Sequence, residues 1–265
     1  MLNKKLTILG TRGIPAQHGG FETFAEKLSL YLVNKGWTVT VYCQVDGEGA
    51  ITESSWEGIN LVNIPVSHPG ALGTIMFDWH ATRHALLQDG MFLLLGYNTA
   101  IFNLLQRIKG QTLLINMDGI EWHRDKWGLI AKTWFWLNER AGCWIGNHLV
   151  ADHPSIKDHL ATRVNRQKVT MIPYGADEVS NADISLLNRY DLAPNQYSIV
   201  IARPEPENSF FEMVTAFSSK IRDHKLIVLG NFQPSTNPYH KRVMEAASNE
   251  VIFPGAIYEL SLIHI

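Results

Sequence analysis

The sequence of 265 residues lacks the features that define several large protein classes. Its two cysteines, Cys43 and Cys143, are too few for a disulfide framework, so we expect a reducing compartment. A net charge of −2 argues against nucleic acid as a partner. No uncharged run reaches the ~20 residues of a membrane span, and the first apolar segment is typical of a strand rather than a signal peptide. These absences predict a cytoplasmic protein, which could touch a membrane only peripherally from that side.

Short apolar segments alternate with helical patterns along most of the chain. The segments are rich in Ile, Leu and Val and mostly do not alternate with polar residues, which is typical of parallel strands buried on both faces. The predicted strands are Lys5–Gly10, Thr38–Cys43, Ile59–Pro65, Met91–Gly96, Thr112–Met117, His148–Asp152, Val169–Ile172, Tyr197–Ala202, Lys225–Gly230 and Val251–Phe253. This order predicts an α/β fold with doubly wound, parallel sheets.

A polar stretch interrupts the pattern and predicts a domain boundary. We expect a first Rossmann-like domain at residues 1–175, a linker at 176–190 and a second Rossmann-like domain at 191–259. The second domain has only about three predicted strands, so we expect it to be incomplete in this chain. The last six residues, 260–265, read LSLIHI, which a transposon-end sequencing adapter also encodes. We interpret them as an adapter scar, with a natural strand as the alternative.

A loop rich in glycine follows the first predicted strand. It holds four glycines, Gly10, Gly13, Gly19 and Gly20, and a helical pattern begins after it. Ligands of parallel sheets bind beyond the carboxyl ends of the strands, and a helix N-terminus preceded by glycines suits a phosphate or carboxylate. The spacing fits neither the nicotinamide fingerprint nor the P-loop. From the glycines alone, a purely structural loop is an equal alternative.

Two long motifs give a more specific interpretation. GTRGIPAQHGGFET at residues 10–23 and NMDGIEWHRDKW at residues 116–127 resemble the rhamnosyltransferase-like branch of glycosyltransferase family 4. Weaker matches follow in the order of the family at residues 151–152, 172–177 and 202–208. The resemblance implies the GT-B fold, in which two Rossmann-like domains face each other across a cleft.

The resemblance also implies an activity. Such enzymes move a sugar from a nucleotide-sugar donor to a glycan or lipid-linked acceptor in surface polysaccharide synthesis, with retention at the anomeric carbon. The resemblance suggests rhamnose as the candidate sugar. No cofactor or metal site is expected, because any Mg²⁺ would come with the nucleotide and the histidines and cysteines lack zinc-binding spacings. Two alternatives are a GT-B nucleotide-sugar 2-epimerase, which needs no acceptor, and a non-catalytic module that binds a sugar nucleotide or a lipid.

Matches to the family assign roles in donor binding. Gly13, Gly19 and Gly20 belong to the loop that faces the donor phosphates and the acceptor. Glu22 either orients this loop or contacts acceptor hydroxyls, and a carboxylate favoured by the helix dipole is its structural alternative. Arg203 matches the arginine that binds the donor diphosphate, with a surface ion pair as the alternative. The acidic donor motif of the family has no counterpart here, so we expect this chain alone to be inactive.

Two acidic residues of the second motif are candidate catalytic groups. Asp118 follows the strand Thr112–Met117, at a position where many members of the family have His. A carboxylate there could bind sugar hydroxyls or stabilise positive charge on the sugar ring, whereas capping the next turn is the structural alternative. Glu121 could act as a base toward an acceptor hydroxyl.

Tryptophan is concentrated in one segment. Five of the eight tryptophans fall between Trp122 and Trp144, among lysines and arginines. This composition suits a membrane interface or a lipid-linked acceptor. Ordinary packing is the favoured alternative, because Trp134, Leu137 and Ala141 fall on one helical stripe.

Overall fold

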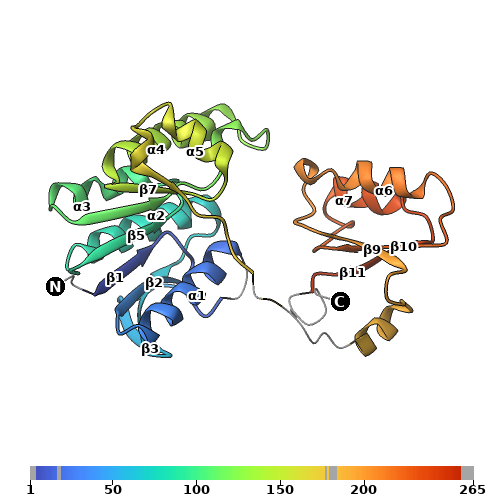
Figure 1. Cartoon of the computed structure of the whole chain (residues 1–265), viewed down its shortest axis with the longest axis horizontal. Coiled ribbons are helices and arrows are strands. Elements are labelled where there is room, and N and C mark those ends of the chain that lie inside the picture. The colour runs from blue at the N-terminus through green and yellow to red at the C-terminus, as the bar shows by residue number, and fades with distance from the viewer. Residues whose placement is uncertain (1–3, 17–18, 177, 179–183, 258–265) are drawn as a thin grey trace. The chain divides into compact units, whose positions relative to one another are not determined.

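A computed structural model describes residues 4–16, 19–176, 178 and 184–257. The chain divides into two compact units, Met1–Gly175 and Ala176–Ile265, and each is built around its own sheet (Figure 1). The segment interpreted as an adapter scar, 260–265, lies outside the described residues.

The first unit is built on an eight-stranded sheet with the order β3-β4-β2-β1-β5-β6-β7-β8. Its strands are β1 (Lys5–Leu9), β2 (Thr38–Asp46), β3 (Thr52–Trp56), β4 (Ile59–Val66), β5 (Met91–Leu95), β6 (Thr112–Asn116), β7 (His148–Ala151) and β8 (Val169–Met171). All neighbours pair in parallel except β3, which is antiparallel to β4. The predicted α/β class with parallel sheets is therefore confirmed. Sequence analysis missed β3 because this edge strand is mostly exposed and polar.

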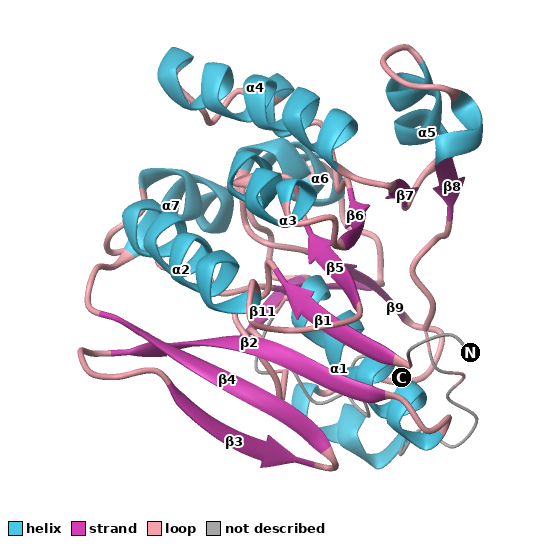
Figure 2. Ribbon diagram, turned by 90° about the vertical axis from the view of Figure 1, so that its left-hand side faces the viewer, coloured by secondary structure: helices cyan, strands magenta, loops and turns pink. Residues whose placement is uncertain are grey.

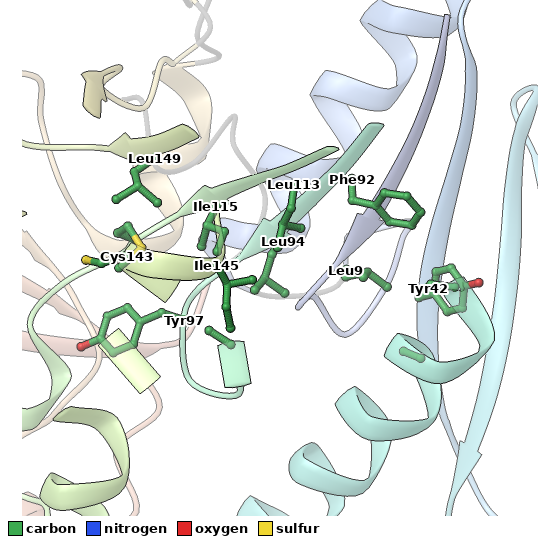
Figure 3. Close-up of a cluster of buried hydrophobic side chains, with 14 of the residues drawn as sticks. Leu9, Tyr42, Phe92, Leu94, Tyr97, Leu113, Ile115, Cys143, Ile145 and Leu149 are labelled. Carbon is green, nitrogen blue, oxygen red and sulfur yellow. The ribbon is translucent and has the colours of Figure 1, made fainter. Parts of the chain in front are cut away.

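Helices lie on both faces of this sheet (Figure 2). They are α1 (Gly20–Asn34), α2 (Gly70–Ala85), α3 (Leu104–Ile108), α4 (Leu129–Ile145) and α5 (Pro154–Ala161), with 3-10 turns η1 (Ala100–Asn103), η2 (Glu121–His123) and η3 (Arg166–Lys168). Successive residues of β1 point to opposite faces, so Ile8 packs in the cluster under α1, and Leu9 packs in the cluster under α2, α4 and α5. Figure 3 shows side chains of this second cluster.

Helix α1 forms where the apolar spacing predicts it. Phe21, Phe24 and Leu28 pack on the core under α1, one or two helical turns apart. Gly36 follows the helix with a φ of 75°, a left-handed conformation that glycine adopts at little cost. The predicted C-terminal stop of this helix is therefore confirmed. Its other end directs free backbone N–H groups toward the glycine-rich loop.

The second unit contains a three-stranded parallel sheet with the order β11-β10-β9. Its elements are η4 (Ile184–Tyr190), β9 (Tyr197–Ile201), η5 (Pro206–Asn208), α6 (Phe210–Ser218), β10 (Lys225–Leu229), α7 (Pro238–Glu245) and β11 (Val251–Gly255). One apolar cluster joins α6 and α7 to the sheet through Phe210, Val214 and Val243. On β9, Ile199 and Ile201 are exposed.

Candidate functional site

The β1–α1 loop depends on glycine at several points. Gly10, Gly13 and Gly19 have φ values of 79°, 127° and 101°, which disfavour other residues. A Cβ on Gly13 would lie 2.8 Å from the Cβ of Cys43, so only glycine lets the loop pass this close to β2. Gly20 is different: it is the first residue of α1, and a Cβ there would meet nothing within 4 Å. The protein itself therefore leaves open space at the helix N-terminus.

Two carboxylates on α1 hold the loop by its backbone. Glu22 Oε1 accepts a hydrogen bond from the Arg12 N–H at 3.2 Å, and Glu26 Oε2 accepts one from the Ala16 N–H at 2.6 Å. The hydrogen bond of Glu22 gives it an orienting task, while contact with acceptor hydroxyls stays a prediction. Sequence analysis did not single out Glu26, although its position one turn after Glu22 places it on the same helix face.

A pocket of about 350 Å³ lies beside this loop at the carboxyl ends of β1, β2 and β4. Its lining combines the loop residues 12–15 and Glu22 with Asp46 of β2 and Asn63 of β4. The Arg12 side chain is exposed, and the described part of the chain supplies no ion pair to it. Gln44 of β2 also lines the pocket, which therefore offers a cation, two carboxylates and two amides to a polar ligand.

Asp118 lies at the carboxyl end of β6 in a strained conformation. Its φ is 50°, which is uncommon for any residue other than glycine. Its N–H donates to Asn116 Oδ1 at 3.1 Å, which holds the turn. Burial raises the pKa of the Asp118 carboxyl, and the charges of Glu121 and Asp152 raise it further, against a lowering by the Gly119 N–H and Arg124. Asp118 is thus a half-buried carboxyl at the ligand-binding edge of the sheet.

Two further residues share this edge. Asp152 follows β7 and is close enough to Asp118 to raise its pKa. Tyr174 follows β8, and its hydroxyl accepts from Asn116 Nδ2 at 3.1 Å. Burial is the main cause that raises the pKa of Tyr174 to about 12. Its ring packs edge-on against Phe24 of α1, with centroids 5.7 Å apart, which joins the Asp118 region to α1.

Glu121 has both carboxylate oxygens engaged. Its Oε1 accepts from Arg124 Nη1 at 2.8 Å, and its Oε2 accepts from Trp127 Nε1 at 3.0 Å. Its backbone N–H donates to the Tyr97 hydroxyl at 2.8 Å. These bonds explain the spacing of Glu, Arg and Trp in the second motif. They show Glu121 as an anchor for residues 121–127, and its action as a base stays a prediction.

A buried ion-pair network supports the same segment from behind. Glu139 on α4 is almost fully buried, and its Oε2 accepts from Trp122 Nε1 at 2.8 Å. His159 Nε2 of α5 lies 3.0 Å from the same oxygen, and Arg163 Nε lies 2.5 Å from Oε1. Sequence analysis did not find this network, because its members are far apart in the chain. It ties η2, α4 and α5 together.

Arg203 in the second unit follows β9 and is exposed. Its carbonyl accepts from the Glu205 N–H and from Asn208 Nδ2, both at 2.7 Å, which fixes the turn. In the described residues no ion pair joins its guanidinium to Glu205, one of the two partners in the alternative that the sequence left open. The turn leads into α6, whose N-terminal N–H groups suit an anion.

His240 on α7 connects the loops that follow β9 and β10 by hydrogen bonds, a role that sequence analysis missed. Its Nδ1 accepts from the Gln233 N–H at 2.9 Å, so Nε2 carries the proton and donates to the Pro204 carbonyl at 2.9 Å. The side chain is buried, so it holds the loops after β9 and β10 at a fixed separation.

The described residues hold no group of three or more His, Cys, Asp or Glu side chains suited to a metal ion. In the same part of the chain, no helix has both the length and the apolar character needed to cross a bilayer.

Solved structures resemble this chain in fold. HepE from Anabaena, in complex with UDP and glucose, has a TM-score of 0.70 at 15% identity and covers 98% of this chain and 71% of its own. The catalytic domain of starch synthase IV from Arabidopsis thaliana, bound to ADP and acarbose, has a TM-score of 0.70 at 13% identity, with coverages of 100% and 76%. A trehalose-6-phosphate protein from E. coli, bound with UDP-2-fluoro glucose, has a TM-score of 0.64 at 9% identity, with coverages of 98% and 75%.

Identities this low show the fold alone, and the fold is the GT-B class that the resemblance implied. No curated protein matches the chain in sequence. Residues 3–177 match the family described as a domain of unknown function, DUF1972, and the chain belongs to this family.

Proposed function

We propose that this protein is a retaining glycosyltransferase that moves a sugar from a nucleotide-sugar donor to a glycan or lipid-linked acceptor. The observation that carries the proposal is the half-buried, strained Asp118 at the carboxyl edge of the first sheet. Strain and a raised carboxyl pKa at a ligand-binding edge are typical of functional sites. The two long motifs and the GT-B fold support the proposal, and rhamnose is the candidate sugar that the motifs suggest.

The reaction makes clear demands on the site. The bond between the anomeric carbon and the diphosphate oxygen breaks, and a bond to the acceptor oxygen forms. The acceptor hydroxyl loses its proton, and positive charge develops on the sugar ring. In its ionised form, Asp118 would stabilise this charge. Glu121 is the predicted base, but it would first have to exchange its bonds to Arg124 and Trp127.

Each unit, taken by itself, offers groups suited to a nucleotide-sugar donor. In the first, the open space at Gly20 lets a phosphate approach the N-terminus of α1. In the second, Arg203 and the start of α6 offer charge and N–H groups to the diphosphate. Because solved structures of similar fold contain UDP or UDP-glucose, uridine nucleotides are the first ligands to test.

The deciding experiment measures nucleotide release with and without an acceptor. The protein encoded by the intact gene is incubated with UDP-glucose or a nucleotide-linked deoxysugar, in the presence or absence of lipid-linked glycan. We expect nucleotide release only when the acceptor is present. Release of nucleotide and free sugar without acceptor would favour the 2-epimerase instead, and binding without any release would favour a non-catalytic module.

A further inference from the structure

Helix α4 has an unusual distribution of side chains. Its buried face includes two polar residues, Asn138 and Glu139. Both have partners there: Asn138 Oδ1 accepts from the Ile101 N–H at 3.0 Å, and the Glu139 carboxylate lies within ion-pair distance of His159 and Arg163. Its large exposed apolar residues are Leu129, Ile130, Trp136, Leu137 and Trp144. The packing interpretation of the sequence is therefore wrong for Leu137, which is 52% exposed.

The exposed residues form a continuous stripe along the helix. Leu129, Thr133, Trp136, Arg140 and Trp144 follow one another at spacings of three or four residues, which places them on one side. Leu137 and Ile130 widen this stripe. We name Leu129, Ile130, Trp136, Leu137, Arg140 and Trp144 the α4 face. An apolar stripe directed outward has no use in packing its own unit, and such patches mark interaction sites.

The charges around the α4 face are mostly basic. The Arg140 guanidinium lies 3.5 Å from the centre of the Trp136 ring, which keeps the cation at the surface among apolar groups. A hollow of about 370 Å³ beside Trp144 is lined by Arg140, Arg163 and Lys168. The one acidic residue of α4 is Glu139, which is buried.

One exposed carboxylate lies at the edge of this region. Asp125 lies 3.7 Å from Lys132, so its charge is compensated within the chain. The α4 face thus combines apolar side chains with an excess of positive charge.

We propose that the α4 face docks on the surface of an anionic lipid bilayer. Leucine, isoleucine and tryptophan would enter the interfacial region, where tryptophan is enriched in proteins. The hollow lined by Arg140, Arg163 and Lys168 would face a lipid phosphate. A second copy of the chain fits less well, because two basic faces would oppose like charges. The proposal does not depend on whether the protein transfers a sugar.

The test is co-sedimentation of the full chain with vesicles. One vesicle is phosphatidylcholine alone, and the other is an equimolar mixture of phosphatidylcholine and phosphatidylglycerol. We expect at least about tenfold tighter binding to the mixed vesicles, with the affinity falling as salt is added.

A pair of matched double variants localises the contact. Leu129→Gln with Ile130→Gln removes side chains that are 81% and 88% exposed on the α4 face. Leu87→Gln with Ile108→Gln removes side chains that are 76% and 75% exposed elsewhere in the first unit. We expect the first pair to weaken binding about tenfold or more, and the second pair to leave it unchanged.

Three outcomes would overturn the proposal. One is equal binding of the chain to both vesicles or to neither. Another is an equal loss of binding in both double variants. The third is self-association that the α4 variant abolishes while vesicle binding is absent, which would assign the face to a second copy. Near-identical thermal unfolding of both variants and the parent protein is the control for folding.

Discussion

The carboxyl edges of the two sheets present their charged groups in different settings. In the first unit, Asp118 is half-buried beside Asp152 and held by a network that reaches α1. In the second unit, Arg203 is exposed and only its backbone is fixed. A buried charge is coupled to the fold, whereas an exposed one is not. The comparison therefore indicates that substitution of Asp118 changes both stability and activity, and that substitution of Arg203 changes ligand binding alone.

The first unit also has the more extensive apolar core. The first sheet carries a buried apolar cluster on each face, whereas the second unit has one cluster, under α6 and α7. All eight tryptophans lie in residues 1–175, so tryptophan fluorescence reports on the first unit alone. Urea unfolding followed by this signal is the measurement for stability changes in that unit.

The largest effect should come from the buried network of α4 and α5. Glu139→Gln removes the almost fully buried carboxylate that pairs with Arg163, whose side chain is only 17% exposed, so we expect the unfolding free energy to fall by about 3–5 kcal/mol. Asp158→Asn is the matched control, because Asp158 pairs with Arg166 at 2.7 Å on the surface. That change should cost at most about 1 kcal/mol. Similar losses in the two variants would remove the distinction between buried and exposed charges.

Substitution of Asp118 should change activity and stability in opposite directions, with lower turnover but no loss of stability. Asp118→Asn keeps the shape and tolerates the left-handed φ, so we expect turnover to fall about 10²-fold or more, in an active form of the protein. Folding raises the pKa of Asp118, so the folded state binds its proton more tightly than the unfolded state. Its ionised form therefore destabilises the fold, and this cost grows as pH rises above the ordinary carboxyl pKa near ~3.9.

The asparagine variant should consequently be at least as stable as the parent at neutral pH, and the difference should vanish in acid. Tryptophan fluorescence at several pH values measures it, and Asp89→Asn, an exposed carboxylate of the same unit, is the control. Normal turnover in Asp118→Asn would show that the carboxylate has no catalytic part. A variant that is both less active and less stable would make Asp118 a structural residue.

Substitution of Arg203 should weaken ligand binding without changing stability. Arg203→Gln removes a cation whose guanidinium is exposed, so thermal unfolding should not change measurably. Binding of UDP or UDP-glucose should weaken about tenfold to a hundredfold, the usual contribution of a charged hydrogen bond. Titration calorimetry measures the affinity for UDP or UDP-glucose in Arg203→Gln and in Lys241→Gln. The second variant, on α7, is the control for the loss of one exposed cation. If both substitutions weaken nucleotide binding equally, Arg203 contributes only to the net charge of the unit and does not contact the diphosphate.

The sequence predicted the fold well because buried parallel strands are continuous apolar runs, and every predicted strand is present. β3 was missed because its exposed polar residues lack that signal. Asp118 could be singled out because it ends a predicted strand within a long motif. Asp152 also ends a strand, but its proximity to Asp118 depends on the pairing of β6 with β7, which no local pattern specifies.

The local sequence pattern also could not predict which side of α4 faces the core. Helical spacing groups Trp134, Leu137 and Ala141 on one stripe, but it does not say which side meets the core. In the structure, the hydrogen bonds of Asn138 and Glu139 fix the inner side, and both depend on partners from other segments. With these polar residues on the inner side, Ala141 still packs on the core, but Leu137 points outward and joins the α4 face.

The smallest effects should come from the adjacent glycines of the loop, which separate backbone strain from ligand access. Gly19→Ala places a Cβ on a φ of 101° and against the Glu22 carboxylate, so we expect a loss of about 1–2 kcal/mol in unfolding free energy. Gly20→Ala meets no atom of the chain within 4 Å, so stability should be unchanged or slightly raised. If a phosphate approaches this helix N-terminus, the Gly20 variant should nevertheless bind the nucleotide-sugar more weakly, because its methyl group occupies the open space. Unchanged binding and turnover in a stable Gly20→Ala protein would place the ligand elsewhere and leave the loop with a purely structural role.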